Sequence, residues 1–353
     1  PVTRIALVGG GTAGHITPLL AVAEQLAGRA ECLVVGTRGG RESELVGSLP
    51  VIHRIPKLPF PRTLNPAAVV FPFRFLAAVW AAYFALKRHS VDVLVGFGGY
   101  TAAAAYLAAR LARIPLVIHE ANAVPGLANR LGARLGAVVG VCFPATPLAH
   151  RAVIGMPLRE AIVTLDRQKQ KSAARRHFGL RPRRPVLLVT GGSSGALRMN
   201  QTIDQVAGEI VAAGWHVLHL RGPGHTSSQA PEGVVSVEYT DRMDLALSTA
   251  DLAVSRAGAT TVSELQVVGL PAVFVPYHVG NGEQEKNAAA TVQAGGAVLV
   301  RQADFTPEWV RQTLLPLLLD RDRIDQMTAA MAGLGKRDGA RVLADWAREA
   351  GGV

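Results

Sequence analysis

The sequence predicts an α/β protein with two doubly wound, Rossmann-like domains, each a parallel sheet, facing a cleft. Its 353 residues are enough for two domains of about 150 residues each. Short β-branched runs alternate with helical stretches, which is typical of a parallel sheet covered by helices on both faces. The two halves also open alike, because residues 4–14 read RIALVGGGTAG and residues 185–195 read PVLLVTGGSSG. Both segments predict a strand, a glycine-rich turn and a helix.

The first domain is expected over residues 1–157. The run Arg4–Val8 predicts a buried strand, and it leads through glycines into a helix at 17–27. The same reasoning predicts further strands at Glu31–Val35, Val91–Val95, Pro115–His119 and Val138–Val141 and an alanine-rich helix at 102–111.

The second domain is expected over residues 158–338. A polar stretch at 166–184, rich in Arg, Lys and Gln, marks the boundary and predicts a solvated helix and turn. Helical periodicity at 340–350, within a C-terminal segment 339–353, does not say which domain this last helix packs on, and we place it on the first. The predicted strands of the second domain are Pro185–Val189, Trp215–Leu220, Val234–Glu238, Asp251–Val254 and Pro271–Val275.

The composition excludes several classes of protein. Hydrophobic residues make up 49% and charged residues 18%, which excludes a disordered chain. Two cysteines, Cys32 and Cys142, can form neither a disulfide framework nor a four-thiolate zinc site, and they indicate a reducing compartment. The apolar run at 5–8 is too short for a signal peptide.

The positive charge is concentrated in the first domain. Residues 1–159 hold 16 basic and 6 acidic side chains, which gives a net charge of +10. Residues 160–353 hold 21 basic and 20 acidic side chains, which gives a net charge of +1. Such a domain attracts nucleic acid, an anionic membrane surface or a polyanionic ligand. The alternative is a generally arginine-rich composition, against which the neutral second half argues.

Residues 67–86 form an almost wholly apolar stretch close to the length that crosses a bilayer. Arg74 and Pro72 count against a true span, since a mid-span arginine costs roughly 2.5–3.5 kcal/mol. An ordinary core helix is a second alternative. We favour a helix that packs on its own domain and presents aromatic side chains to lipid, because 51–91 holds no acid. The candidate aromatic residues are Phe71, Phe73, Phe75, Trp80 and Phe84, and the basic residues around them are Arg54, Lys57, Arg62, Arg74, Lys87 and Arg88.

The glycines Gly9, Gly11 and Gly14 match the pattern G-x-G-x-x-G after a strand and before a helix. Such a loop lets backbone N–H groups approach a phosphate at the start of a helix. In a dinucleotide-binding domain an acidic residue after the second strand binds the ribose of NAD. Here the second strand leads to Arg38, which disfavours NAD and would suit the extra phosphate of NADP. A tight turn without ligand is the alternative.

His15 follows the loop, and a histidine there could accept a proton from a hydroxyl, cap the helix or contact a phosphate.

Two more segments of the first domain end predicted strands with glycines or polar residues. Gly96–Tyr100 is a second candidate anion loop, and Glu120–Asn122 follows the next strand. In a doubly wound fold such residues lie at the carboxyl edge of the sheet. A solvated loop is the alternative for the second segment.

The strongest motif of the second domain is Ser255–Glu264, which reads SRAGATTVSE. It predicts a strand end, a turn and a helix that starts near Ala259, whose first N–H groups could bind a diphosphate. Glu264, one turn further, could accept hydrogen bonds from a ribose diol, although an acid near a helix start is also favoured by the dipole. Gln284 and Asn287 share one helical face and suit sugar recognition, or else a solvated helix start.

Taken in order, these motifs resemble the MurG-type N-acetylglucosaminyltransferases of peptidoglycan synthesis, over nearly the whole chain. The segments that carry the resemblance are GGTAGH at 10–15, GGY at 98–100, HEAN at 119–122, GMPLR at 155–159, GGSSGA at 191–196, RAGATTVSE at 256–264, and GEQ at 282–284 with Asn287.

The resemblance implies a GT-B fold and an inverting transfer of GlcNAc from UDP-GlcNAc. The acceptor would be the 4-hydroxyl of MurNAc in undecaprenyl-diphospho-MurNAc-pentapeptide (lipid I), giving lipid II and UDP. It implies no cofactor and no metal, with UDP-GlcNAc as a co-substrate. It also implies a peripheral enzyme on the cytoplasmic face of the plasma membrane, active in cell-wall synthesis, with other cell-wall or division proteins as further partners.

Site residues are carried over by position. His15 matches the residue proposed as general base. Gly11, Gly98, Gly99 and Tyr100 match the loops that the acceptor diphosphate approaches. The positions that match UDP-GlcNAc contacts are Thr12, Ala13, Gly14, Asn122, Arg159, Ser193, Thr240, Ala259, Thr260, Thr261, Val262, Ser263, Glu264 and Gln284.

The sequence departs from the family at Ala13, Ala121, Met156 and Ser194, where members often have Gly, Gln, Asn and Gln. Ala13 and Ala121 can contribute backbone contacts alone, and Met156 removes a hydrogen bond at the hinge. Three other functions compete with the transfer: an NADP-dependent oxidoreductase using Gly9–Gly14, a non-catalytic nucleotide-sugar binding protein, and a nucleic-acid binder. The 5% aromatic content and the lack of a known motif argue against the last.

Overall fold

The computed structural model describes residues 2–10, 13–38, 47, 49–56, 66–192, 196–225, 230–277 and 282–352, with backbone alone at 13 and 66–68. The chain divides into two compact units. The first unit comprises Pro1–Glu160 with Arg337–Val353, and the second comprises Ala161–Lys336. These limits lie within three residues of the expected boundaries at 157/158 and 338/339.

The first unit contains a seven-stranded parallel sheet in the order β3-β2-β1-β4-β5-β6-β7. The chain winds outward from β1 to β3 and then returns to place β4 beside β1. This switch is where a doubly wound fold binds its ligand, at the carboxyl ends of the strands. The strands are β1 (Arg4–Val8), β2 (Glu31–Thr37), β3 (Val51–Ile55), β4 (Val93–Gly96), β5 (Leu116–Glu120), β6 (Val138–Val141) and β7 (Arg151–Val153).

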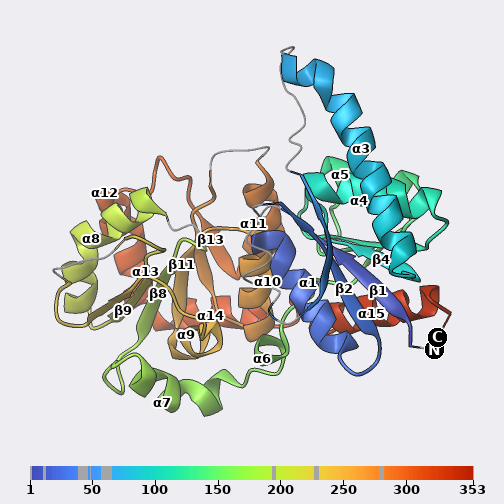
Figure 1. Ribbon diagram of the computed structural model, residues 1–353. Helices are drawn as coiled ribbons and strands as arrows, with labels where there is room; N and C mark the ends of the chain where they lie inside the picture. The colour runs from blue at the N-terminus through green and yellow to red at the C-terminus, as the bar shows by residue number, and fades with distance from the viewer. Residues whose placement is uncertain are drawn as a thin grey trace. The chain divides into compact units, whose positions relative to one another are not determined.

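Helices cover both faces of this sheet (Figure 1). They are α1 (Ala13–Leu26), α3 (Pro66–Arg88), α4 (Tyr100–Leu111), α5 (Leu127–Arg134) and α15 (Gly339–Ala350). One apolar cluster joins the sheet to α3, α4 and α5, and a second joins it to α1 and α15. The C-terminal helix α15 buries Leu343, Ala344 and Ala347 in the second cluster. It therefore belongs to the first unit.

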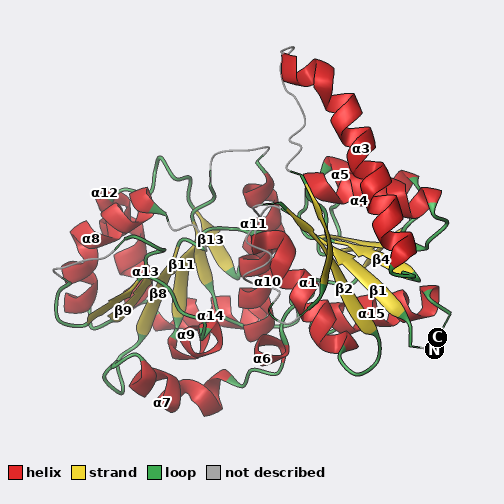
Figure 2. Cartoon of the chain, in the orientation of Figure 1, coloured by secondary structure: helices red, strands yellow, loops and turns green. Residues whose placement is uncertain are grey.

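The second unit repeats this winding with six parallel strands in the order β10-β9-β8-β11-β12-β13 (Figure 2). The strands are β8 (Val186–Thr190), β9 (His216–Leu220), β10 (Val234–Val237), β11 (Leu252–Ser255), β12 (Ala272–Phe274) and β13 (Ala297–Leu299). The helices are α6 (Glu160–Val163), α7 (Arg167–His177), α8 (Leu197–Ala212), α9 (Met243–Thr249), α10 (Ala259–Val268), α11 (Glu283–Gln293), α12 (Pro307–Trp309), the π-helix η1 (Val310–Leu314), α13 (Leu315–Leu319) and α14 (Arg321–Met331). The two Rossmann-like domains predicted from the sequence are confirmed.

One expectation about helices is confirmed in part, and another needs correction. The helix expected to be solvated after residue 166, α7, buries Ala174 alone, but its other side is fixed, because Arg167 donates to backbone carbonyls and Lys171 pairs with Asp251 at 2.6 Å. In α3, Phe71 and Phe75 are half-buried against the core and stack on each other at 5.7 Å, so they are not presented to solvent. Their positions on the helix turn them toward the sheet.

The rest of α3 carries an exposed apolar face. Phe73 is 73% exposed, Phe84 64% and Trp80 46%, whereas Ala78, Val79, Ala82 and Leu86 are buried. Residues 69–88 form one candidate membrane span by length and mean hydropathy, with 22% of the window buried. Figure 1 shows the N-terminal end of α3 reaching beyond the other elements of the first unit. Lys57 and Arg62, expected beside it, lie outside the described residues.

Candidate functional site

Glycine loops follow β1 and β4 in the first unit, and they pack directly against each other. A Cβ atom at Gly10 would lie 1.9 Å from Thr101 Oγ1, and one at Gly99 would lie 2.4 Å from the Gly10 carbonyl oxygen. Gly98 and Gly99 also have φ angles of +84° and +88°, which disfavour other residues. Only glycine therefore allows the two loops to pack backbone against backbone at this edge of the sheet. Tyr100 starts α4 and is half-buried.

His15 lies in the first turn of α1, directly after the loop of β1. It is half-buried, and the preceding residue Gly14 is exposed. The carbonyl of His15 lies within 3.0 Å of where a Cβ atom of Gly9 would stand, so loop and helix are in close contact. The predicted residues Gly11 and Thr12, and the side chain of Ala13, lie outside the described part of the chain.

The loop after β5 is built around the carboxylate of Glu120. Its oxygens accept N–H groups from Asn122 at 2.8 Å, Gly126 at 3.0 Å and the Asn129 side chain at 2.9 Å. Asn122 is half-buried, and its carbonyl accepts from Thr146 Oγ1 at 3.0 Å. Glu120 thus shapes the loop, and the backbone of the predicted residue Asn122 is held at both ends.

His119 connects β5 to the segment that leads out of the first unit. It is fully buried, and its Nε2 lies 2.8 Å from the carbonyl oxygen of Gly155. Burial lowers the pKa of His119 to about 4, so the ring is neutral. Arg159 follows on the same segment. It is half-buried, and its Nε is buried with no hydrogen-bond partner among the described residues.

The start of α10 is the candidate anion site of the second unit. β11 ends at Ser255, and Gly258 occupies the N-cap position without a capping side chain in the described structure. The first-turn N–H groups of Ala259, Thr260 and Thr261 are therefore not satisfied by a side-chain cap, which is the condition for binding a phosphate. The side chains of Val262, Ser263 and Glu264 are buried, so Val262 can contribute its backbone alone.

Gln284 and Asn287 share one face of α11, as predicted, and both hold the turn before α10. Gln284 Oε1 accepts the N–H groups of Ala257 at 3.2 Å and Tyr277 at 2.8 Å. Asn287 Nδ2 donates to the Ala257 carbonyl at 3.3 Å. The contacts that the structure shows for these side chains are positioning contacts. The helix begins at Glu283 rather than near residue 281.

Arg256 has a structural role at this site that was not predicted from the sequence. This buried guanidinium donates to the Val275 carbonyl at 2.9 Å and lies 5.3 Å from the centre of the Tyr277 ring. It thereby joins the turn after β11 to the turn after β12. The signal in the sequence was an arginine within an otherwise apolar strand and turn. A buried charge needs hydrogen-bond or ionic partners, so such a residue is expected to connect elements.

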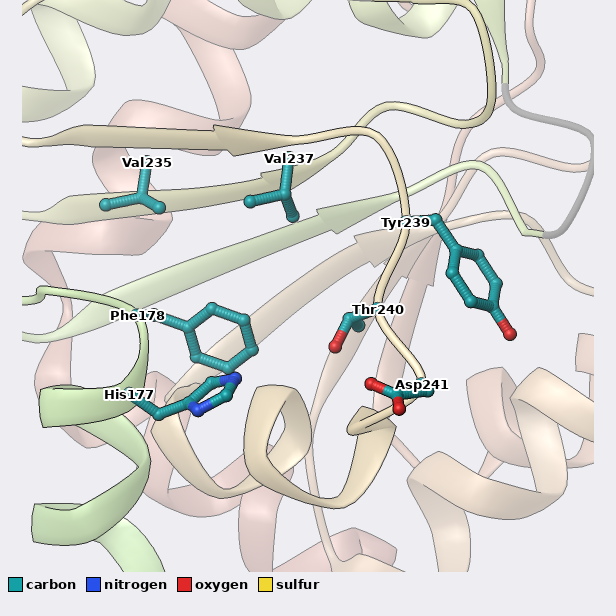
Figure 3. Close-up of a pocket in the computed structure, with 7 residues that line it drawn as sticks. All are labelled: His177, Phe178, Val235, Val237, Tyr239, Thr240 and Asp241. Atoms are coloured by element: carbon teal, nitrogen blue, oxygen red, sulfur yellow. The ribbon is translucent and has the colours of Figure 1, made fainter.

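Thr240 lies beside a hollow of about 590 Å³ at the edge of the second sheet (Figure 3). Its hydroxyl accepts the Arg242 N–H at 3.0 Å and so fixes the turn into α9. Ser193, another predicted contact, lies outside the described residues. The residues that line the hollow are His177, Phe178, Val235, Val237, Tyr239, Thr240 and Asp241.

A second set of hydrogen-bonded side chains that was not predicted from the sequence lies at and after the end of β9. Arg221 forms two hydrogen bonds of 2.6 and 2.7 Å with Asp204, and His219 Nε2 lies 2.9 Å from Asn200 Oδ1. Burial, together with the Arg221 charge, lowers the pKa of His219 to about 4, so it is neutral. These hydrogen bonds hold the N-terminal half of α8 against the end of β9. α8 follows the glycine-rich segment 191–195. Nothing in a single sequence pairs these positions.

Two parallel-sheet domains, each with a glycine turn at the carboxyl edge of its sheet, are the architecture of the GT-B fold. Two family models match this chain: the glycosyltransferase family 28 N-terminal domain over residues 5–140 and the C-terminal domain over residues 186–343. The chain therefore belongs to glycosyltransferase family 28.

Curated relatives of nearly equal length carry one name, UDP-N-acetylglucosamine–N-acetylmuramyl-(pentapeptide) pyrophosphoryl-undecaprenol N-acetylglucosamine transferase. The protein of Clavibacter sepedonicus is 52% identical, over 99% of this chain and 96% of its own length. That of Streptomyces coelicolor is 45% identical, over 98% of both chains. The resemblance stated from the motifs is confirmed by these relatives.

Solved structures agree with the fold. The crystal structure of Acinetobacter baumannii MurG matches with a TM-score of 0.81 and 28% identity, covering 99% of this chain and 100% of the other. The calicheamicin glycosyltransferase CalG4 matches with a TM-score of 0.68 at 18% identity, covering 100% and 99%, which shows the shared fold alone.

Proposed function

We propose that this enzyme transfers GlcNAc from UDP-GlcNAc to the 4-hydroxyl of MurNAc in undecaprenyl-diphospho-MurNAc-pentapeptide, with inversion at the anomeric carbon. The products are lipid II and UDP. The observation that carries the proposal is the start of α10, where no side chain of the described residues caps the backbone N–H groups and Glu264 lies one turn further along. The helix start suits a diphosphate, and the carboxylate suits the hydroxyls of a ribose.

In this proposal the donor is held by the second unit together with Arg159. The N–H groups of Ala259–Thr261 stabilise the negative charge that develops on the departing UDP, and the arginine adds a full positive charge. Oriented dipoles and a guanidinium can carry this charge, and the proposal invokes no cofactor or metal. The remaining predicted donor contacts are Thr12, Ala13, Gly14, Asn122, Ser193, Thr240 and Gln284.

The first unit supplies the base and the acceptor site. The acceptor oxygen attacks C1 of GlcNAc, the bond from C1 to the phosphate oxygen breaks, and the hydroxyl proton passes to His15, directly or through water. UDP leaves with the electron pair of the broken bond, so charge and protons balance. The loops with Gly11, Gly98, Gly99 and Tyr100 receive the diphosphate of the acceptor.

The donor assignment is tested by calorimetric titration of the whole chain with UDP-GlcNAc, UDP-GalNAc and NADPH in parallel. We expect binding of UDP-GlcNAc, weaker binding of UDP-GalNAc and no heat with NADPH. A Glu264→Gln variant should bind UDP-GlcNAc about tenfold less tightly, because a neutral amide is a weaker acceptor for ribose hydroxyls. Turnover with lipid I then tests the acceptor. Binding of NADPH alone would instead assign the loop of Gly9 to a dinucleotide.

We further propose that the enzyme is peripheral to the cytoplasmic face of the plasma membrane and docks through α3. The support is its exposed apolar face, with Arg74, Lys87 and Arg88 exposed on the same helix. Apolar side chains insert into the headgroup boundary while basic ones attract anionic lipid.

We expect the double variant Phe73→Gln/Phe84→Gln to lower binding to vesicles containing anionic lipid at least tenfold. Each phenyl ring contributes roughly 1.5–3 kcal/mol when it leaves water. Co-sedimentation with vesicles measures the loss. The matched control is Leu319→Gln, which removes an equally exposed side chain (66%) from the second unit and should change nothing. Equal binding of the double variant and the native chain would rule out α3 as the docking helix.

A further inference from the structure

A buried tyrosine that the transfer mechanism does not use joins two of the loops at the carboxyl edge of the first sheet. Tyr106 lies in α4 and has no exposed surface. Its hydroxyl oxygen accepts the backbone N–H of Gly98 at 3.1 Å and donates its proton to Asn129 Oδ1 at 2.8 Å. A single phenol thus contacts the glycine loop after β4 and the helix α5 that follows the next loop.

The surrounding chain makes room for this ring and keeps it protonated. A Cβ atom at Gly96 would lie 2.1 Å from the ring, and one at Gly132 would lie 3.1 Å from it. Burial raises the pKa of Tyr106 far above its usual range, so the phenol always has one proton to donate. A phenylalanine would fill the same space but leave the Gly98 N–H and Asn129 Oδ1 without this partner.

The hydrogen bonds continue from Asn129 to the second loop. Its Nδ2 donates to Glu120 Oε2 at 2.9 Å and to the His119 carbonyl at 3.1 Å. The other oxygen of Glu120 accepts the Asn122 N–H at 2.8 Å. Four hydrogen bonds therefore connect the amide of Gly98 to the amide of Asn122 through buried side chains.

We propose that Tyr106 is a positioning residue for the glycosyl transfer: it couples the Gly98 loop to the Glu120–Gly126 loop, so that both present a fixed backbone to the substrates. The inference rests on the proposed function, in which the Gly98 loop receives the acceptor diphosphate and Asn122 lies at the donor sugar. Donors that are already oriented cost no reorganisation when charge develops, which is why a fixed loop matters for rate.

The test compares Tyr106→Phe with Tyr83→Phe in the full-length chain. Tyr83 is a half-buried tyrosine of the same unit whose ring packs on Trp80 and Phe84. The variant Tyr83→Phe is therefore a matched control, because it also removes one hydroxyl group. We expect Tyr106→Phe to lower kcat/KM for lipid I about tenfold, with UDP-GlcNAc affinity changed less than about twofold, because unpartnered buried groups disfavour the native loop geometry. The control variant should match the native chain.

Two further readouts separate positioning from general loss of structure. Hydrogen exchange at the amides of 98–100, 122–124 and 126 should accelerate together in Tyr106→Phe and stay unchanged in Tyr83→Phe. The double variant Tyr106→Phe/Asn129→Ala should be no slower than Asn129→Ala alone, since residues that act as one unit are not additive.

The outcomes distinguish this inference from the proposed function. Native-like kcat/KM for lipid I in Tyr106→Phe, or faster exchange confined to 98–100, would overturn the coupling. A native chain that binds UDP-GlcNAc but transfers nothing to lipid I would overturn the proposed acceptor. In that case hydrogen exchange still decides whether Tyr106 couples the two loops.

Discussion

Replacing His15 by alanine is expected to lower kcat by about 100- to 10,000-fold, the range that general-base catalysis typically contributes. The affinity for UDP-GlcNAc should change less than about twofold, because the proposed diphosphate and ribose contacts are at α10. His15 is half-buried in the first turn of α1, which follows β1, so the residue lies at the carboxyl edge of the first sheet, as do the proposed acceptor loops. Steady-state transfer to lipid I and calorimetry with UDP-GlcNAc measure the two quantities.

The matched control for His15 is His89→Ala, which removes a half-buried histidine after the C-terminal end of α3. It should leave kcat within about twofold. Turnover at the native rate in His15→Ala would remove this residue from the base role. A large loss of UDP-GlcNAc affinity with unchanged kcat would instead make it a donor contact.

Much of the fold could be predicted from the chain because parallel strands are buried on both faces. Segments such as Arg4–Val8 and Val138–Val141 are β-branched runs bounded by polar or glycine residues, and the structure has the same limits. The short edge strands Val51–Ile55 and Arg151–Val153 were missed, since half-buried His53 and exposed Arg54 and Arg151 break the apolar pattern. At a sheet edge there is less burial to select an apolar residue.

The sequence could predict which residues lie at the candidate site, but not which atoms their side chains contact. The start of α10 at Ala259 follows from a strand, a glycine and two threonines, and the structure agrees. The sequence does not tell whether a polar side chain at that edge turns to the substrate or to the chain. Gln284 holds the backbone of Ala257, and Glu120 binds the N–H groups of its own loop. Tyr106 was not singled out from the sequence, because its hydroxyl partners Gly98 and Asn129 belong to other elements.

Arg167 connects the ends of two helices of the second unit. Its guanidinium donates to the carbonyls of Leu247 at 3.1 Å and Gly269 at 3.1 Å, and it also binds those of Val268 and Ala250. These carbonyls close α9 and α10, where the helix dipole is negative and the last C=O groups lack helical partners. Burial lowers the pKa of Arg167, but an arginine remains charged in a folded protein.

We expect Arg167→Ala to lower the free energy of unfolding of the second unit by about 3–5 kcal/mol, because several buried carbonyls lose a charged donor at once. Arg167→Lys should recover part of the loss, since an ammonium keeps the charge but lacks the planar fork. Denaturant unfolding followed by tryptophan fluorescence, in a chain whose first-unit residues Trp80 and Trp346 are replaced by Phe, measures the change through Trp215 and Trp309. The control Arg311→Ala removes an exposed ion pair with Glu209 and should cost less than about 1 kcal/mol.

The same variant links stability to function. Since Arg167 holds the C-terminal end of α10 and the proposed diphosphate site is at its other end, saturating UDP-GlcNAc should restore part of the lost stability by binding the folded state. A second unit as stable as the native one in Arg167→Ala would show that the four carbonyls find water or other donors at no cost. Lost stability that UDP-GlcNAc does not restore, in a variant that still binds it, would place the donor outside the second unit, and with it the charge stabilisation on which the proposed transfer depends.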